Sequence, residues 1–454
     1  MSRWRWRWPW LAASLLILGG CASDGRYSTL QPMQGVDRKV DMSDVRGLRQ
    51  MDRTPVQDAG LLNYVQTVRA RLEKAHGQPC DCTVLVDSFG GYEAYSLSTR
   101  TIVVSAGLVA QAGSEDEIAA VIAHELGHVY QGDTTKGTLQ ETALQVVKAG
   151  GWAAGAGGYT MMFGETVDDV AKGLIYHRFN EQQEVAADAF SAQLLVKAGY
   201  SLDGLKMAVR RLNAYSAGAL QARSSEPPPQ CVTSKNGVYT FNFKKCGKQL
   251  SGSGASVYQT APARLKPVMD YAASLPDDQR RRRPAGAPPS FASVNYLFGL
   301  NSLVSSDRKQ LIAALARVQA QPLPPTLAGN VAVTNKLAMA YNIAGDQQRA
   351  ADNLTRSLQS NGRTAWTFNY LFKQVDRSGD SRQVLEAINA SHEEIGYMTQ
   401  LLPVEYYLAK RHKLQVYEMV AYGRCLSNLV DDMNTYNTCA KFEKYAKSSG
   451  AAQW

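Results

Sequence analysis

The sequence predicts a mostly helical α+β protein, in which a helical domain with a small sheet is followed by an α-solenoid. Three observations lead to this fold class. The chain has 454 residues, for which two domains are expected. In its first half, two short β runs alternate with amphipathic helical patterns. Beyond Ser290 the pattern is helical, and it recurs after 34 residues.

The N-terminus has the organisation of a secretory leader. Arginines alternate with tryptophans, an apolar run follows, and a Leu-Gly-Gly-Cys sequence ends at Cys21. This order predicts a signal peptide over residues 1–20 and resembles a bacterial lipobox, so we expect lipidation of Cys21 and a polar tether over residues 21–50. Ala22 in place of Asp favours the outer membrane, so the expected location is the periplasm, with a lipid anchor in that membrane. The alternative is an ordinary secretory signal with an incidental cysteine.

Six further cysteines follow Cys21, an even number that suggests disulfides in an oxidising compartment. The pairs expected to close short loops are Cys231–Cys246 and Cys425–Cys439. Cys80 and Cys82 flank a single residue, so a bridge between them is expected to be strained. Free thiols at these two positions are the alternative.

The formal net charge of +9 includes three arginines of the leader and is modest for a chain of this length. The sequence shows no basic stripe with interleaved aromatic residues, so nucleic acid is not an expected partner. The basic run at residues 280–283 precedes several prolines. It predicts a solvated linker over residues 276–290.

The first domain is expected over residues 51–275, and periodicity and caps predict its elements. Apolar residues at helical spacing predict a helix over residues 56–75. Ser114 and Glu117 form a capping box that opens a second helix, and Gly199 ends a later helical pattern. The remaining expected elements are β runs at residues 83–86 and 101–105 and a helix over residues 202–212.

Residues 216–259 interrupt the helical pattern and are rich in Ser, Gly and Pro. Asn236-Gly237 lies between two β-like segments, which is a strong hairpin signal. With Cys231 and Cys246 bridged, this hairpin would form a stapled insert in the first domain. A lid that contacts the substrate and a plain surface excursion are both consistent with such an insert.

The second domain is expected over residues 291–454. Gly345-Asp346 recurs as Gly379-Asp380, at the 34-residue period of a tetratricopeptide unit. Helix pairs of this kind bury their apolar faces only by stacking, so a small solenoid is implied. An irregular helical bundle is the alternative.

The most informative motif is His124-Glu125-Leu126-Gly127-His128, on the helix that the capping box opens. Two imidazoles four residues apart on a helix share a face and can reach a single Zn²⁺. The carboxylate of Glu125 then points towards the water on that ion. A chance occurrence is the alternative, but the chain holds only six histidines.

A catalytic zinc ion needs a third protein ligand. Gln131 and Thr134 occupy the positions where an extended His-Glu-x-x-His-x-x-Gly-x-x-His motif has Gly and His, which excludes that class. Glu184, on the later helical pattern, would complete a His₂Glu set. Asp188, one turn further on, could accept the free ring N–H of a ligand histidine. An acidic pair at this spacing is by itself a weak signal.

Over residues 55–215 the chain resembles the gluzincin metallopeptidase family of HtpX and the CAAX prenyl endopeptidases. Within that family it resembles the periplasmic BepA-like lipoprotein branch with C-terminal tetratricopeptide repeats. The segments that carry the resemblance are residues 64–66, 102–108, 124–129, 184–188 and 199–200. The resemblance implies a zincin-type metallopeptidase domain followed by helical repeats.

The resemblance also implies roles for individual residues. His124, His128 and Glu184 would bind one zinc ion per chain, and Glu125 would be the general base for hydrolysis of a peptide bond. Residues 93–101 would present an edge strand, to which an extended peptide adds by β-augmentation.

One departure from the family bears on the transition state. Members often carry His-Pro followed by Arg after the third ligand, and here Ala261 stands where that histidine is expected. Tyr258, Arg264 or His177 could supply an electrophile instead.

The predicted function is a zinc-dependent endopeptidase that cleaves misfolded or unassembled envelope proteins in outer-membrane protein quality control. The expected partners are protein and peptide substrates, the membrane through the lipid anchor, and the outer-membrane assembly machinery through the helical repeats. One alternative is a largely non-proteolytic chaperone or adaptor that binds a partner with its repeats. The other is a specialised processing enzyme that acts on one partner.

Overall fold

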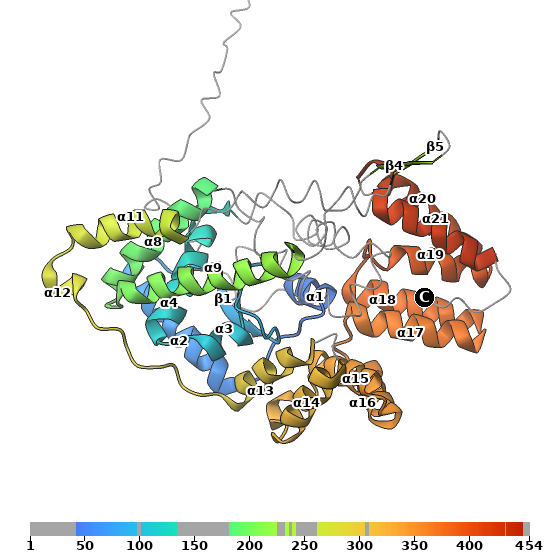
Figure 1. The fold of residues 1–454 in the computed structure, drawn as a ribbon, viewed down its shortest axis with the longest axis horizontal. Helices are drawn as coiled ribbons and strands as arrows, with labels where there is room; N and C mark the ends of the chain where they lie inside the picture. Colours follow the sequence, from blue (N-terminus) through green and yellow to red (C-terminus); the bar gives the residue numbers. More distant parts are fainter. Residues whose placement is uncertain are drawn as a thin grey trace, which may run out of the picture.

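The computed structural model in Figure 1 has the predicted mostly helical α+β architecture with a small sheet. It describes residues 42–97, 101–133, 181–224, 232–235, 238–241, 261–304, 308–431 and 433–447. The predicted leader, Cys21, the Cys231–Cys246 pair, His177 and Tyr258 lie outside these residues. Within the described stretches, no helix has the length and apolar character that crossing a membrane requires.

The sheet of the N-terminal half has three strands in the order β1–β3–β2. β1 (Thr83–Asp87) runs parallel to β3 (Thr101–Ser105), with Val86 paired to Val104, and these strands are the two predicted β runs. β2 (Ala94–Ser96) pairs antiparallel with β3 and forms one edge of the sheet. It lies within the segment for which the family resemblance predicts an edge strand.

The inner face of the sheet is apolar and packs against helices α2 (Ala59–His76) and α4 (Glu115–Gln131). Strand and helix residues join there in the main core: Val84, Val86, Ile102, Val104, Leu61, Val65, Ile118 and Ile122. Each fully buried Val, Leu or Ile contributes roughly 1.5–3 kcal/mol. This layer holds the motif helix against the sheet.

Helix α4, which carries the His-Glu-x-x-His motif, begins at the predicted N-cap Ser114, but the Glu117 carboxylate accepts from Gly113 rather than from Ser114, so the reciprocal half of the capping box is absent. The Ser114 hydroxyl accepts the N–H of Glu117 at 3.3 Å, and the Glu117 carboxylate accepts the N–H of Gly113 at 2.8 Å. The helix ends at Gly132, whose φ of 66° is the left-handed conformation that favours glycine. Both ends of the motif helix are therefore specified locally.

Helices α8 (Glu181–Lys197) and α9 (Leu202–Ser224) pack against α4. α8 ends just before Gly199, as predicted. α9 continues through residues 216–224, so the predicted start of the insert at residue 216 is wrong. Several alanines in that stretch favour the helix.

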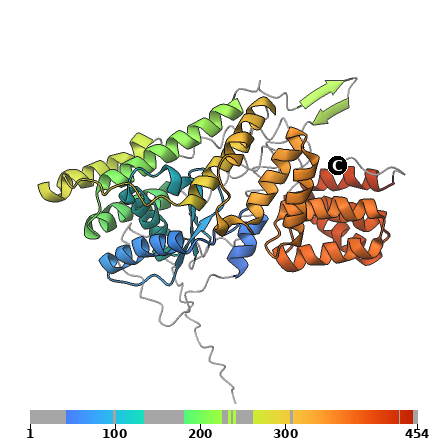
Figure 2. The same cartoon turned by 90° about the horizontal axis from the view of Figure 1, so that it is seen from below.

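The predicted hairpin is present. β4 (Val232–Lys235) pairs antiparallel with β5 (Val238–Phe241). In Figure 2 the two strands extend away from the helices. The Asn236-Gly237 turn lies outside the described residues.

The outer face of the sheet is covered by α1 (Met42–Gln50), so the predicted tether is wrong over these residues. Leu48 of α1 is fully buried against apolar side chains of the sheet: Leu85, Tyr95, Leu97 and Val103. This buried leucine and its neighbours hold in place a helix in which five of the nine residues are polar or charged. α1 also contacts α18 in the C-terminal half (Figure 1).

The C-terminal half is helical and contains two successive helix pairs. The pairs are α15 (Val331–Ala344) with α16 (Gln347–Gln359), and α17 (Ala365–Ser378) with α18 (Ser381–Ile395). The second pair repeats the first after the predicted 34 residues. Gly345 and Gly379 end the first helix of each pair with positive φ, and Asp346 and Asp380 cap the second.

The other helices flank these pairs or belong to the N-terminal half. They are α3 (Ala106–Gln111), α11 (Ala261–Ser274), α12 (Asp277–Arg280), α13 (Ala292–Leu300), α14 (Arg308–Gln319), α19 (Leu402–Arg411), α20 (Gln415–Asp431), α21 (Met433–Lys447) and the 3-10 turns η2 (Asn301–Val304) and η3 (Pro325–Leu327).

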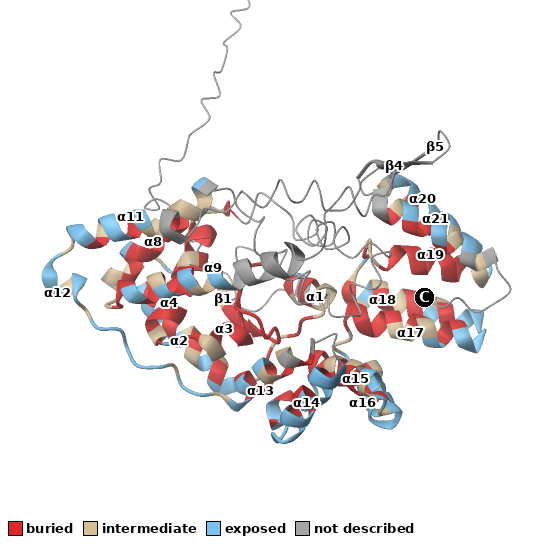
Figure 3. Cartoon of the chain, viewed as in Figure 1, coloured by how far each residue is buried: buried red, intermediate tan, exposed pale blue. Residues whose placement is uncertain are grey.

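The main core does not divide at the predicted linker. Residues 276–290 are largely exposed, as predicted (Figure 3). The core of the N-terminal half nevertheless continues through α13 to α16, with Val294, Leu297 and Val333 among its members. A second core begins at Ala365. The boundary between the two apolar cores therefore lies between α16 and α17, and buried hydrogen bonds from Asn335 to Thr364 and Thr367 cross it.

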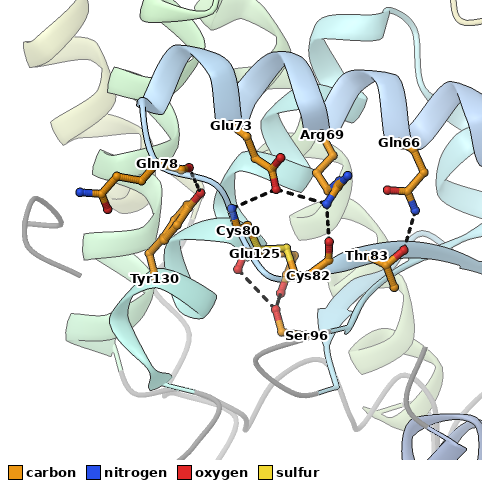
Figure 4. Close-up of a disulfide and its surroundings, with 10 residues drawn as sticks. All are labelled: Gln66, Arg69, Glu73, Gln78, Cys80, Cys82, Thr83, Ser96, Glu125 and Tyr130. Atoms are coloured by element: carbon orange, nitrogen blue, oxygen red, sulfur yellow. Dashed lines mark hydrogen bonds and ion pairs between the residues drawn. A yellow bond between two sulfur atoms is a disulfide. The ribbon is translucent and has the colours of Figure 1, made fainter. Parts of the chain in front are cut away.

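Two disulfides lie in the described residues. Cys425–Cys439 joins α20 to α21, as predicted. Cys80 and Cys82 are also bridged, so the free-thiol alternative is wrong. Helix α2 holds this turn from one side, because Glu73 accepts the N–H of Cys80 at 3.1 Å and Arg69 donates to the carbonyl of Cys82 (Figure 4).

Asp52, just after α1, is a pH-sensitive contact between the two halves. Its carboxylate accepts the backbone N–H of Trp366 at 2.8 Å. Burial outweighs this hydrogen bond and raises the pKa of Asp52 to about 7. The folded state therefore prefers the protonated form. The resulting destabilisation is absent near pH 4, grows as the pH rises, and levels off above pH 7.

We expect Asp52→Asn to raise the free energy of unfolding at pH 8 by on the order of 1 kcal/mol, and by less as the pH falls towards 5. The amide keeps an acceptor for Trp366 and tolerates the φ of 56° at this position. Urea unfolding at both pH values measures the effect, with Asp278→Asn at an exposed carboxylate as the control. A stability difference independent of pH would contradict it.

Candidate metal centre

His124 and His128 lie one turn apart on α4 and converge on one point. Their Nε2 atoms are 3.2 Å apart, and their ring planes are inclined by 82°. His128 is only 1% exposed. The convergence is the one that the four-residue spacing predicts.

Glu184, on α8, reaches both imidazoles. Its Oε2 lies 3.5 Å from Nε2 of His124, and its Oε1 lies 3.7 Å from Nε2 of His128. The helices approach this closely because Gly127 has no side chain. A Cβ at residue 127 would lie 3.3 Å from the Cα of Ala187, so a larger residue would push α8 and its glutamate away.

The donor set fits a zinc ion. Tetrahedral zinc with nitrogen and oxygen ligands at about 2.0–2.2 Å places those atoms roughly 3.3–3.5 Å from one another. The two Nε2 atoms are 3.2 Å apart, and they lie 3.5 and 3.7 Å from the two different oxygens of Glu184. One donor atom from each of the three residues lies within 4.8 Å of the other two. Among the described residues, Glu73, Cys80 and Cys82 also lie close enough to hold an ion. The two sulfur atoms of that group are joined in the disulfide, so they do not offer thiolates.

A carboxylate orients each histidine through its other ring nitrogen. Asp188 lies 3.0 Å from Nδ1 of His124, which is the predicted contact. Asp133 lies 3.1 Å from Nδ1 of His128 and accepts a further hydrogen bond from Gln183 at 2.7 Å. Such contacts select the tautomer that presents Nε2 to a metal. Asp133 is not among the residues predicted from the sequence, although a carboxylate directly after Gly132, which ends the motif helix, is a usable signal.

Arg264, on α11, contacts the carboxylates of Asp188 and Glu184. Its guanidinium donates to both oxygens of Asp188, at 2.8 and 2.7 Å, and lies 3.4 Å from Oε2 of Glu184. This side chain is 6% exposed. Its donors hold the third ligand and the neighbouring Asp188 carboxylate in place. The same side chain lines the cavity, so its role as an electrophile stays a prediction.

The electrostatics of the centre favour a bound cation. Burial raises the pKa of Asp188, but Arg264 and His124 outweigh burial and hold it well below its usual range. The pKa of Glu184 is likewise lowered against burial by its hydrogen bond and charge interaction with His124. Burial lowers the pKa of His124, yet its hydrogen bonds to Asp188 and Glu184 raise it to about 10. A metal ion would displace that imidazole proton.

Glu125 lies next to the three donors and lines the same cavity. The hydroxyl of Ser96, on the inner side of β2, donates to its Oε2 at 2.8 Å (Figure 4). The edge strand is thus tied directly to the carboxylate of the motif. Ser96 was also missed, since it precedes Glu125 by 29 residues and only the packing of β2 on α4 brings them together.

The cavity measures about 840 Å³, including its open mouth. Its polar lining includes the motif residues and the groups around them: Glu93, His124, Glu125, His128, Glu184, Asp188 and Arg264. α4 and α9 supply most of its apolar wall, with Ala120, Val121, Leu205, Ala208, Val209 and Leu212. β2 contributes Ala94 and Tyr95 along one side. The polar centre therefore opens onto an apolar pocket beside an edge strand.

Comparison with known proteins agrees with this geometry. Residues 62–283 match Peptidase family M48. Metalloprotease LoiP and Metalloprotease YcaL of Escherichia coli (strain K12) are each 28% identical over 154 residues, which cover 34% of this chain. The match spans 59% of the length of each of these curated relatives. Mitochondrial metalloendopeptidase OMA1 of Arabidopsis thaliana is 26% identical over 191 residues, 40% of this chain and 36% of the relative.

Over residues 62–283 the chain is therefore similar to Peptidase family M48, and part of it is similar to curated metalloproteases. The predicted resemblance is confirmed at that level. The BepA-like branch and the tetratricopeptide assignment of the repeated helix pairs stay predictions.

Proposed function

We propose that this protein is a zinc-dependent endopeptidase that a lipid anchors to the outer membrane, facing the periplasm. The observation that carries the catalytic part is the convergence of His124, His128 and Glu184, with Glu125 beside them in one cavity. The similarity to family M48 supports the same part. The leader sequence that ends at Cys21 supports the location.

Each residue of the site has a distinct proposed role in peptide-bond hydrolysis. A zinc ion held by the two imidazoles and Glu184 would polarise the scissile carbonyl and acidify a water molecule. Glu125 is placed to take a proton from the attacking water and to pass it to the leaving amine. Ser96 orients that carboxylate through its hydrogen bond. Arg264 holds Glu184 in position.

The proposed substrate is an extended polypeptide segment. β2 lies at the sheet edge next to Glu125, so a substrate strand can pair with its backbone with little dependence on sequence. The apolar pocket accepts an aliphatic or aromatic side chain next to the scissile bond. Segments of this kind are exposed in unfolded chains and buried in folded ones.

Misfolded or unassembled envelope proteins are therefore the proposed clients, and outer-membrane protein quality control the proposed process. We assign partner binding, including contact with the outer-membrane assembly machinery, to the helix pairs α15–α18. Their 34-residue spacing and their caps support a tetratricopeptide-like arrangement.

The test is zinc stoichiometry measured together with peptidase activity. The purified mature protein is expected to hold one zinc ion per chain and to cleave unfolded casein. A chelator should abolish cleavage, and added zinc should restore it. Mass spectrometry of the fragments should show apolar residues next to the cleaved bonds. Cleavage by zinc-free protein would contradict the proposal.

A non-proteolytic adaptor with a zinc site is the second candidate. Ala261, at the start of α11, favours it because related peptidases often place a histidine there. Zinc-loaded protein that binds unfolded chains without cleaving them would support the adaptor.

A further inference from the structure

Arg53 is a buried cation on the outer face of the sheet, opposite the motif helix. It follows α1 and is 3% exposed. Its guanidinium lies 2.7 Å from the carboxylate of Glu93 and 3.2 Å from that of Asp87. It also donates to the hydroxyl of Tyr95 at 3.1 Å, and that hydroxyl donates to Asp87 at 2.8 Å. The ring of Phe89 packs against the guanidinium, 4.2 Å away.

This charged network lies beside an otherwise apolar cluster of Leu48, Leu85, Leu97 and Val103. A buried ion pair is weak evidence for stability, because desolvation offsets its attraction and apolar side chains often serve as well. A planar guanidinium instead orients the groups around it, because its donors point in fixed directions and hold several acceptors in place at once. The main effect of the network is therefore to fix the positions of the side chains that Arg53 contacts, which are Asp87, Glu93 and Tyr95.

Those partners lie on the edge strand. Successive residues of a strand face opposite sides of a sheet. Glu93, directly before β2, and Tyr95, within it, face Arg53. Ser96 faces the other side and donates to Glu125. In the described sheet β2 is three residues long and pairs with β3 alone, so the network and Ser96 hold it from its two faces.

The backbone that carries Arg53 is anchored as well. The side chain of Gln50 donates to the carbonyl of Ile395 at 2.6 Å, and Asp52 accepts the N–H of Trp366 at 2.8 Å. Helices α17 and α18 therefore fix the segment from which Arg53 reaches the strand.

We propose that Arg53 is a positioning residue, which sets where the peptide-binding edge strand lies relative to Glu125. Through that placement it controls how tightly an extended substrate binds. The inference rests on the proposed function only in naming β2 as the strand that pairs with the substrate.

The test compares a long peptide with a short one in the zinc-loaded protein. A peptide of about twelve residues can pair along β2, whereas one of about four residues reaches little beyond the scissile bond. Arg53→Met should raise KM for the long peptide about ten-fold and change kcat by less than about two-fold. The kcat/KM for the short peptide should stay within about two-fold of wild type. Arg53→Lys keeps the positive charge, so its KM for the long peptide should lie between those of wild type and Arg53→Met.

A binding measurement separates this proposal from the peptidase proposal. In a Glu125→Gln background, Arg53→Met should raise the Kd of the labelled long peptide about ten-fold. If wild type cleaves neither peptide, the peptidase proposal fails and this Kd alone decides the role of Arg53. If Arg53→Met lowers kcat/KM equally for the long and the short peptide, or leaves KM and Kd unchanged, the positioning role is overturned.

Controls exclude a general loss of structure. Arg283→Met makes the same change at an exposed site and should leave every parameter unchanged. Zinc content and the urea midpoint report whether each variant is folded. If Arg53→Met does not fold, Arg53→Lys and Tyr95→Phe carry the test, and the loss of the single Tyr95 hydroxyl should raise KM about three-fold.

Discussion

Replacing Glu125 with Gln is expected to lower kcat/KM for casein-derived peptides by about a hundred- to ten-thousand-fold, with zinc content unchanged. The amide cannot accept the proton that a carboxylate takes from water. It has nearly the same shape and can still accept the hydrogen bond that Ser96 now donates. The three donors of the metal centre are untouched. Initial rates and the zinc content of the same preparation measure the two quantities together.

The matched control is Glu393→Gln, which makes the same change at an exposed position of α18. It should alter neither rate nor zinc content. If cells that carry Glu125→Gln perform as well as wild type, the adaptor function is favoured over the peptidase. A joint loss of zinc and activity would instead place Glu125 among the metal ligands.

Removal of the Arg264 guanidinium should have the second largest effect. Arg264→Leu leaves Asp188 and Glu184 buried, with the His124 imidazole still beside them. We expect the free energy of unfolding of the metal-free protein to fall by about 3 kcal/mol, the low end for a broken buried ion pair. Zinc affinity should weaken about 10- to 100-fold, because the third ligand loses its support.

Urea unfolding in the presence of chelator measures the stability term, and competition with a zinc indicator measures the affinity. Arg264→Lys keeps a charge but not the two-pronged contact with Asp188, so it should lie between wild type and Arg264→Leu. Arg283→Leu, at an exposed site, is the control and should change neither quantity. Wild-type zinc affinity in Arg264→Leu would show that the guanidinium does not support the site.

The parts of the site that sequence reasoning identified depend on local geometry. His124, Glu125 and His128 share a helix, so their spacing alone specifies their common face. Asp188 follows Glu184 by one turn of α8, and this spacing predicts that it can contact a ligand histidine; the packing of α8 on α4 makes that histidine His124. The caps of α4 and the glycines that end α15 and α17 are likewise local signals.

The parts that escaped prediction arise from tertiary packing. Ser96 and Arg53 act on β2 from opposite faces, and no spacing along the chain relates them. Arg264 is one of three candidate electrophiles on the sequence alone, because its contact with Asp188, 76 residues earlier, has no sequence signature. α1 was missed because a single well-packed leucine, Leu48, outweighs the polar composition of its segment.

The continuity of the main core past residue 290 bears on how the chain can be shortened. Truncation after residue 290 would remove Phe291 and α13. It would expose to water the ring of Tyr64, which packs against Phe291, and the side of α3 that α13 covers. Such a fragment would tend to aggregate even though it keeps every ligand of the metal. The smallest autonomous folding unit should instead end near residue 359, after α16, where one core stops before the next begins at Ala365.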